Sequence, residues 1–166
     1  VQKYDNVIVL RTLSKGYSLA GLRLGFGVAN PTLLEGLIKV KDSYNLDAVA
    51  CAVGAAAIGD RTHKNANAEK IKASRTQLAK ALQDMGFYVF PSQANFLLVQ
   101  SPSGNAQFLY EALKQRGILV RYFNQSQLAD KLRITVGTPE QNETLIEVLG
   151  ELLASDQLSL ASQSLV

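Results

Sequence analysis

The sequence has little of what several common kinds of site require. It contains one cysteine, Cys51, one histidine, His63, and no tryptophan. A single cysteine excludes an intrachain disulfide framework. One cysteine and one histidine are also too few to build a zinc site or a histidine-based triad. Such cysteine usage is typical of a reducing compartment, so we expect a cytoplasmic location and no metal.

Long apolar runs and concentrated charge are also lacking. The most apolar window, 48–59, consists largely of alanine and glycine and is shorter than the roughly 20 residues that a membrane span needs. We expect it to form a buried core helix, and we expect no membrane partner. The net charge of +3 comes from lysines and arginines scattered along the chain, so nucleic acid is not an expected partner either.

What is present predicts a folded globular protein, because 47% of the residues are hydrophobic and 19% are charged. In the first part of the chain, apolar runs at 7–11 and 23–29 predict two strands. A helix is expected to begin with Pro31 after Asn30, and a second helix, 48–59, is expected to be capped by Asp47. A long polar helix at about 63–85 ends at Gly86. The later part predicts an α+β pattern, with strands at 87–90, 95–100, 118–122 and 132–136 and helices at 105–116 and 139–153.

The connection between the first two strands carries residues suited to a phosphate-bearing cofactor. It reads Thr-Leu-Ser-Lys-Gly-Tyr-Ser-Leu-Ala-Gly-Leu-Arg-Leu-Gly, at 12–25. A lysine amine holds pyridoxal phosphate as an imine, and the phosphate group needs hydroxyls, backbone N–H groups and an arginine nearby. Lys15, Thr12, Ser14 and Arg23 supply these groups. The residues alone leave open a solvated surface loop instead.

The same segment resembles the lysine signature of the fold-type I pyridoxal-phosphate enzymes, in particular the aminotransferase class that includes histidinol-phosphate aminotransferase. The resemblance implies that Lys15 is the catalytic residue and binds the cofactor, pyridoxal 5'-phosphate. It implies that Ser14 and Arg23, with Thr12, bind the cofactor phosphate. Tyr17 occupies a variable position of the signature, and we expect it to pack.

Three further motifs extend the resemblance to residue 153. They are Tyr44-Asn45-Leu46, Gln93-Ala-Asn-Phe and Leu132-Arg-Ile-Thr-Val-Gly-Thr. By resemblance, Arg133 grips the acidic end of the substrate, Arg121 is a second anion-binding arginine, and Asn45 lies on the substrate side. Planar guanidinium groups suit both carboxylate and phosphate. Solvated positions at strand ends remain the alternative for both arginines.

The resemblance implies an α/β fold in which residues 1–62 form the C-terminal part of the large, pyridoxal-phosphate-binding domain. Residues 63–153 would form the small C-terminal α+β domain, and we expect 154–166 to be a flexible tail. The aspartate that holds the cofactor ring nitrogen in this family is missing, since Asp5 does not fit its motif. The family's glycine-bearing phosphate loop and ring-stacking aromatic are missing as well. We therefore expect an incomplete C-terminal portion that is inactive alone.

The implied function is transamination between histidinol phosphate and 2-oxoglutarate, with glutamate as the other amino compound, in histidine biosynthesis. Lys15 would serve as both tether and base, and the whole protein would be a homodimer. Two alternatives stay open. One is a related enzyme, such as threonine-phosphate decarboxylase or another amino-acid aminotransferase, and the other is a noncatalytic domain that retains the fold.

Overall fold

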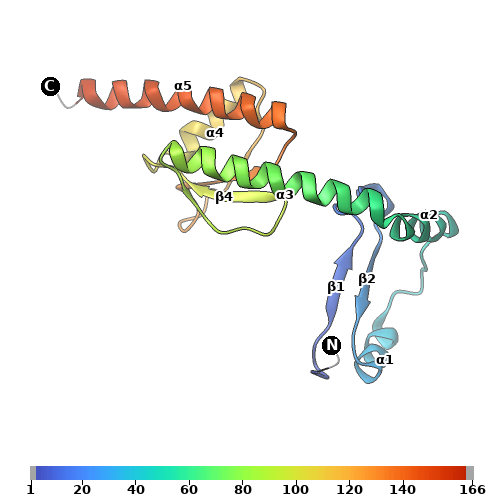
Figure 1. The fold of residues 1–166 in the computed structure, drawn as a ribbon. Helices are drawn as coiled ribbons and strands as arrows, with labels where there is room; N and C mark the ends of the chain where they lie inside the picture. Colours follow the sequence, from blue (N-terminus) through green and yellow to red (C-terminus); the bar gives the residue numbers. More distant parts are fainter. Residues whose placement is uncertain (1–2, 164–166) are drawn as a thin grey trace. The chain divides into compact units, whose positions relative to one another are not determined.

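The computed structural model describes residues 3–163, and their side chains as far as 155. The chain divides into two compact units, Val1–Ala68 and Glu69–Val166. The boundary between them lies inside helix α3 (Arg61–Asp84), as does the boundary at 62/63 expected from the sequence. Figure 1 labels helices α1 to α5 and strands β1, β2 and β4, and each unit is described by itself.

Unit 1 begins with a two-stranded antiparallel sheet. Strand β1 (Val9–Thr12) pairs with β2 (Gly25–Val28), and Thr12 lies opposite Gly25. The connection contains a short 3-10 turn, η1 (Ala20–Leu22). This confirms the two predicted strands and their shared sheet, although both are shorter than the apolar runs in the sequence. The signature segment thus lies between two paired strands.

Helix starts in unit 1 follow the capping residues read from the sequence. The side chain of Asn30 accepts a hydrogen bond of 3.0 Å from the Thr32 N–H, and Pro31 opens helix α1 (Pro31–Val40). Asp47 accepts a bond of 2.8 Å from the Ala50 N–H at the start of helix α2 (Ala48–Gly59). Local side-chain to backbone bonds therefore fix where both helices begin.

Helix α2 differs from the buried core helix that its composition predicts. Only Ala50 and Gly54 are buried among its described residues, and Cys51 is exposed. Gly54 faces Leu24 and Leu13, so one side of the helix packs on the loop after β1. The prediction of a buried core helix was wrong because, within unit 1, only the side of α2 that carries Ala50 and Gly54 packs against other residues.

Unit 2 contains a four-stranded antiparallel sheet in the order β3-β4-β6-β5. The strands are β3 (Tyr88–Val89), β4 (Phe96–Gln100), β5 (Arg121–Tyr122) and β6 (Lys131–Thr135). All four predicted strands are present. The predicted strand 118–122 pairs only over its last two residues.

One face of this sheet carries the core of unit 2. Leu97 and Val99 of β4 lie opposite Ile134 and Leu132 of β6, and all four are buried. Leucines of α3, α4 (Ala106–Gln115) and α5 (Pro139–Gln163) complete the same hydrophobic cluster. Because side chains alternate along a strand, Phe96, Leu98, Arg133 and Thr135 lie on the other face. That face positions the candidate anion site.

Helix α5 is longer than the sequence analysis expected. It continues to Gln163, so the expectation of an unstructured segment was wrong for 154–163. That stretch contains neither glycine nor proline, and serine and glutamine lower helix propensity only slightly, so nothing in it ends the helix. Residues 164–166 of the expected tail lie outside the described residues. Within the described part of the chain, every helix is too short or too polar to cross a membrane.

Candidate functional site

The loop after β1 holds two hydroxyl groups in a short hydrogen-bonded turn. Thr12 Oγ1 donates to Ser14 Oγ at 2.8 Å and accepts from the Ser14 N–H at 3.1 Å. Leu13 between them is buried, and its N–H donates to the Leu24 carbonyl at 3.0 Å. The buried leucine therefore anchors the turn, and the pair of hydroxyls stays partly accessible.

Lys15 follows this turn and is exposed. Its carbonyl accepts a hydrogen bond of 3.1 Å from the Ser18 N–H, and Ser18 adopts the left-handed conformation with φ 56°. Within the described residues, the Lys15 amine takes part in no hydrogen bond and no ion pair. The loop thus exposes a lysine amine that has no bonding partner among the described residues, and this lysine directly follows the turn with the two hydroxyl groups.

Arg23 stands just before β2 and also adopts the left-handed conformation, with φ 52°. This conformation is uncommon for a residue other than glycine and is concentrated at functional sites. Its Nη1 donates to the Ala20 carbonyl at 3.2 Å, and the guanidinium is exposed. Within the described residues, this bond engages one of the five N–H donors of the Arg23 guanidinium. The other donors can bind an oxyanion.

Thr12, Ser14 and Arg23 carry the kinds of donor that bind a phosphate group, with the hydroxyls at one end of the loop and the guanidinium at the other. Asn45, also in unit 1, lies between α1 and α2, where its Oδ1 accepts from the Lys41 ammonium at 2.9 Å. This contact engages the oxygen of the Asn45 carboxamide. The amide nitrogen donates no hydrogen bond within the part of the chain that the structure describes.

The other predicted site residues, Arg121 and Arg133, belong to unit 2 and lie directly opposite each other on β5 and β6. Both are exposed. Paired residues of an antiparallel sheet project from the same face, so the two guanidinium groups share one face. The guanidinium carbon of Arg121 lies 5.3 Å from the Phe123 ring centroid, and that of Arg133 lies 5.3 Å from the Phe96 ring centroid.

Nearby charges leave this arginine pair uncompensated. Lys131, on the same face of β6 as Arg133, donates to Asp130 Oδ1 at 2.6 Å. This bond holds the pKa of the Asp130 carboxyl below its ordinary value of 3.8 and keeps it ionised. Among the residues that the structure describes, neither arginine forms such an ion pair. The positive charge of the pair is therefore available to an anion.

The sequence analysis missed the two aromatic supports of these arginines. Phe123 follows Arg121 by two positions, so strand alternation could have placed both on one face. Phe96 was quoted in the Gln93-Ala-Asn-Phe motif, but its contact with Arg133 depends on the pairing of β4 with β6, in which Phe96 lies opposite Thr135. A single sequence does not give that register.

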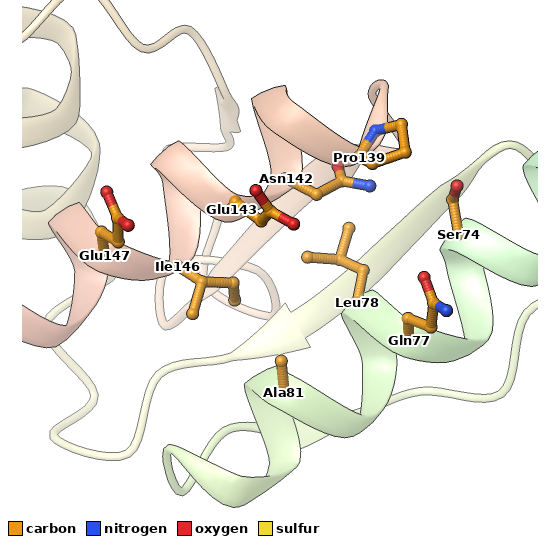
Figure 2. A pocket seen from close by; sticks show the side chains of 9 residues that line it. All are labelled: Ser74, Gln77, Leu78, Ala81, Pro139, Asn142, Glu143, Ile146 and Glu147. Atoms are coloured by element: carbon orange, nitrogen blue, oxygen red, sulfur yellow. The ribbon is translucent and has the colours of Figure 1, made fainter.

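A groove of about 380 Å³ lies elsewhere in unit 2, between α3 and α5 (Figure 2). Leu78, Ala81 and Ile146 line it, with the carboxylates of Glu143 and Glu147 on the α5 side. All of the predicted site residues lie outside its lining. Its two carboxylates would repel a phosphate or carboxylate ligand, so the candidate anion-binding groups are those of the signature loop in unit 1 and, separately, those of the arginine pair in unit 2.

His63 has a structural role at the start of a helix. Its backbone N–H donates to the Asp60 carboxylate at 3.0 Å at the start of α3, and its ring contacts the Asn67 amide at 2.9 Å. No group of three potential metal ligands is found within residues 3–163.

Comparison with known proteins identifies the family of the chain. The family model for "Aminotransferase class I and II" matches residues 1–149. Histidinol-phosphate aminotransferase 1 of Nostoc sp. is 64% identical over 155 residues, which cover 93% of this chain and 44% of that protein. The chain thus spans less than half the length of this curated relative.

Two solved structures show the same fold. Histidinol-phosphate aminotransferase from Sinorhizobium meliloti, in complex with pyridoxal-5'-phosphate, superposes with a TM-score of 0.80 at 27% identity, over 91% of this chain and 42% of that one. L-threonine-O-3-phosphate decarboxylase from Porphyromonas gingivalis gives a TM-score of 0.79 at 25% identity, over 93% of this chain and 49% of that one. Because an aminotransferase and a decarboxylase match almost equally well, the fold alone does not choose a reaction. The family model and the closely similar Nostoc sequence do settle the family: this chain belongs to the class I and II aminotransferases.

Proposed function

We propose that this chain carries the lysine and the substrate arginines of a pyridoxal-phosphate-dependent aminotransferase that acts on histidinol phosphate and 2-oxoglutarate. The observation that carries the proposal is the exposed Lys15 amine on a loop whose other polar groups, Thr12, Ser14 and Arg23, suit a phosphate. The 64% identity to the Nostoc histidinol-phosphate aminotransferase supports the choice of substrates.

The loop residues would divide the binding of the cofactor between them. Ser14 and Thr12 would donate hydroxyl hydrogen bonds to the phosphate, and Arg23 would bind it through the planar edge of its guanidinium. Lys15 would hold the aldehyde end through its amine. When bound, pyridoxal phosphate supplies an electron sink that stabilises negative charge on the substrate carbon.

Lys15 would also act as the general base. Once its amine is released by the incoming amino substrate, Nζ accepts the proton from the amine-bearing carbon and later returns a proton. A base in this role must be accessible to the substrate. The exposure of Lys15 and the absence of a bound carboxylate partner within the described residues fit that requirement.

The arginine pair of unit 2 would bind the acidic end of each substrate. Two like charges directly opposite on neighbouring strands repel each other, and a dianion between them would relieve that repulsion. The phosphate of histidinol phosphate carries up to two negative charges, and the distal carboxylate of glutamate carries one. Arg133 and Arg121 would therefore serve both half-reactions, with the phosphate bound more tightly.

We further propose that 1–62 belongs to the large cofactor-binding domain, that 63–153 belongs to the small domain, and that the whole protein is a homodimer. The resemblance of the signature segment and the 44% coverage of the Nostoc relative support an incomplete C-terminal portion. Asn45 would contribute its amide nitrogen on the substrate side, since Lys41 occupies its oxygen.

A chimera tests the cofactor site and the reaction together. The upstream part of the Nostoc relative is joined to this chain, pyridoxal phosphate is added, and the protein is reduced with borohydride and mapped by mass spectrometry. We expect a pyridoxyl group on Lys15 and none on Lys41, which serves as the internal control. We also expect keto product from histidinol phosphate in the presence of 2-oxoglutarate.

Two outcomes would redirect the proposal. Release of carbon dioxide in place of amino transfer would favour the related decarboxylase. A folded chimera whose Lys15 stays unmodified would overturn the enzyme proposal and favour a noncatalytic domain that retains the fold.

A further inference from the structure

The loop 90–95, which leads from β3 into β4, is held from outside by one side chain of α3. Arg75 Nη1 donates to the Ala94 carbonyl at 2.8 Å, and Nη2 contacts Gln93 Oε1 at 3.3 Å. Arg75 is half-buried, and it forms no ion pair within the described residues. Its charge is therefore directed at two neutral oxygens of one loop.

The loop is also fastened internally and to β6. Ser92 Oγ donates to the Phe96 carbonyl at 2.7 Å and accepts from the Ala94 N–H at 3.0 Å. The Val136 N–H donates to the Asn95 carbonyl at 3.0 Å, which ties the loop to the end of β6. Through Ser92 Oγ, these bonds link Ala94, whose carbonyl Arg75 holds, to Phe96, the first residue of β4.

That first residue, Phe96, supports the anion-binding arginine. Its ring centroid lies 5.3 Å from the guanidinium carbon of Arg133, a distance at which the ring face attracts the cation. Arg133 is otherwise an exposed side chain with many rotamers. The position of the Phe96 ring therefore helps to set where the Arg133 guanidinium lies.

We propose that Arg75 is a positioning residue, which holds the loop 90–95 so that Phe96 orients Arg133 for anion binding. The inference rests on the proposed role of Arg133. Arginine suits the task because its two terminal nitrogens reach the Ala94 and Gln93 oxygens together, whereas a lysine ammonium is a single point. Arg75 acts through Phe96 and Arg133 and makes no contact with the substrate.

The test measures anion affinity at Arg133 in the 166-residue chain. Inorganic phosphate is titrated into the ¹⁵N-labelled protein, and the Nε–Hε signal of Arg133 is followed by NMR. Arg75→Gln should weaken the apparent phosphate affinity by about three- to tenfold, the effect of losing one or two hydrogen bonds. Arg75→Lys should recover part of the loss, because it keeps one donor toward Ala94.

Lys72→Gln is the matched control. It removes one positive charge from the same helix. Among the described residues Lys72 pairs with the exposed Glu69 alone, so phosphate affinity should stay at the wild-type value. If Arg75→Gln unfolds, Gln93→Ala removes one of the two contacts and should weaken affinity about twofold.

Three results would overturn the inference. The first is an Arg75→Gln variant in which the Ala94 and Val136 amides exchange faster while phosphate affinity is unchanged, which indicates a structural role alone. The second is an unfolded Arg75→Gln variant together with unchanged affinity in Gln93→Ala. The third is a wild-type chain whose Arg133 signal does not respond to phosphate. Labelling of Lys15 in the chimera is independent of all three, so failure here and failure of the proposed function are separable.

Discussion

Arg121 lies directly opposite Arg133 across β5 and β6, so two exposed guanidinium groups share one face of the sheet. Like charges in this arrangement repel by about 0.2–1 kcal/mol. Each arginine also gains about 0.5–1 kcal/mol from the aromatic ring beside it, Phe123 or Phe96. The two ring contacts together are therefore large enough to offset the repulsion, so the fold can hold the two guanidinium groups on one face.

The first prediction concerns the salt dependence of stability. Arg121→Gln removes both the repulsion and the contact with Phe123, so its effect at one salt concentration has no fixed sign. Salt screens the repulsion, with a Debye length of about 3 Å at 1 M, but not the ring contact. Urea unfolding should show that the wild-type chain gains more stability from added sodium chloride than Arg121→Gln does.

Lys70→Gln is the control for this comparison, since Lys70 is exposed on α3 and has no ion pair in the described part. It should keep the wild-type salt response. Equal salt responses for wild type and Arg121→Gln would show that the Arg121 and Arg133 guanidinium groups do not repel each other measurably.

The second prediction concerns Gly25, which lies opposite Thr12 at the end of the sheet in unit 1. A methyl group at Gly25 would meet the Arg11 carbonyl oxygen at 2.7 Å, and this backbone atom cannot turn aside as a side chain can. Gly25→Ala should separate β1 from β2, lower stability by about 1–3 kcal/mol, and reduce pyridoxyl labelling of Lys15 in the chimera.

Gly36→Ala is the matched control, because nothing lies within 4 Å of its added methyl group and Gly36 is inside helix α1. Alanine there should be neutral or stabilise the helix by up to about 1 kcal/mol. Normal Lys15 labelling in Gly25→Ala would show that the loop does not depend on close pairing of the strands.

The third prediction concerns the start of α5, where Thr138 and Gln141 form a capping box. The Thr138 N–H donates to Gln141 Oε1 at 3.0 Å, and the Gln141 N–H donates to Thr138 Oγ1 at 3.3 Å. A methyl group on Gly137 would lie 2.8 Å from Gln141 Oε1. Gly137→Ala should therefore displace Gln141 and cost about 0.5–2 kcal/mol, the typical loss of a helix cap.

Thermal unfolding of two glycine variants on the same stretch checks this. Gly150→Ala lies within α5, and the nearest atom to its added methyl is Met85 Cε at 3.9 Å, so it should raise the unfolding temperature. Similar effects of the two substitutions would contradict the capping argument, because the box would then be unaffected by the methyl group at Gly137.

The sequence predicted the local features of the fold better than the long-range ones. Asn30 and Asp47 cap the helices that follow them, and Gly86 and Gly117 end helices with φ of 89° and 76°. Such features depend on residues that are neighbours in the chain. The strand order β3-β4-β6-β5 and the contact of Arg75 with Ala94 depend on distant residues, which no periodicity in a single sequence encodes.

The candidate site divides in the same way. The residues Thr12, Ser14, Lys15 and Arg23 come from one continuous motif, and the structure places them on one loop between paired strands. Arg121 and Arg133 were named separately from their motifs, and only the register of β5 with β6 reveals that they face each other. The continuation of α5 past residue 153 was missed because a polar composition was taken for disorder.

The fourth prediction concerns pH and the Asp130 carboxylate, which precedes the strand that carries Arg133. The hydrogen bond from Lys131 lowers the pKa of Asp130 below 3.8, so folding favours its ionised form. A lowered folded pKa contributes stability that is present above the unfolded value and is lost as pH falls through the folded value. Asp130→Asn should therefore destabilise the chain at pH near 7, and the difference from wild type should shrink as the pH is lowered below about 4.

The partner of Asp130 explains why this carboxylate matters to the site. The Lys131 side chain is only 16% exposed, and without Asp130 its ammonium would keep only the Gln127 carbonyl, at 3.0 Å, among its described partners. Lys131 would then add a third uncompensated charge to the face of the sheet that carries Arg121 and Arg133. Urea unfolding at neutral and acidic pH measures the effect, with Glu143→Gln as a control for net charge. A difference between wild type and Asp130→Asn that stays constant with pH would mean that Asp130 contributes through shape and not through its charge.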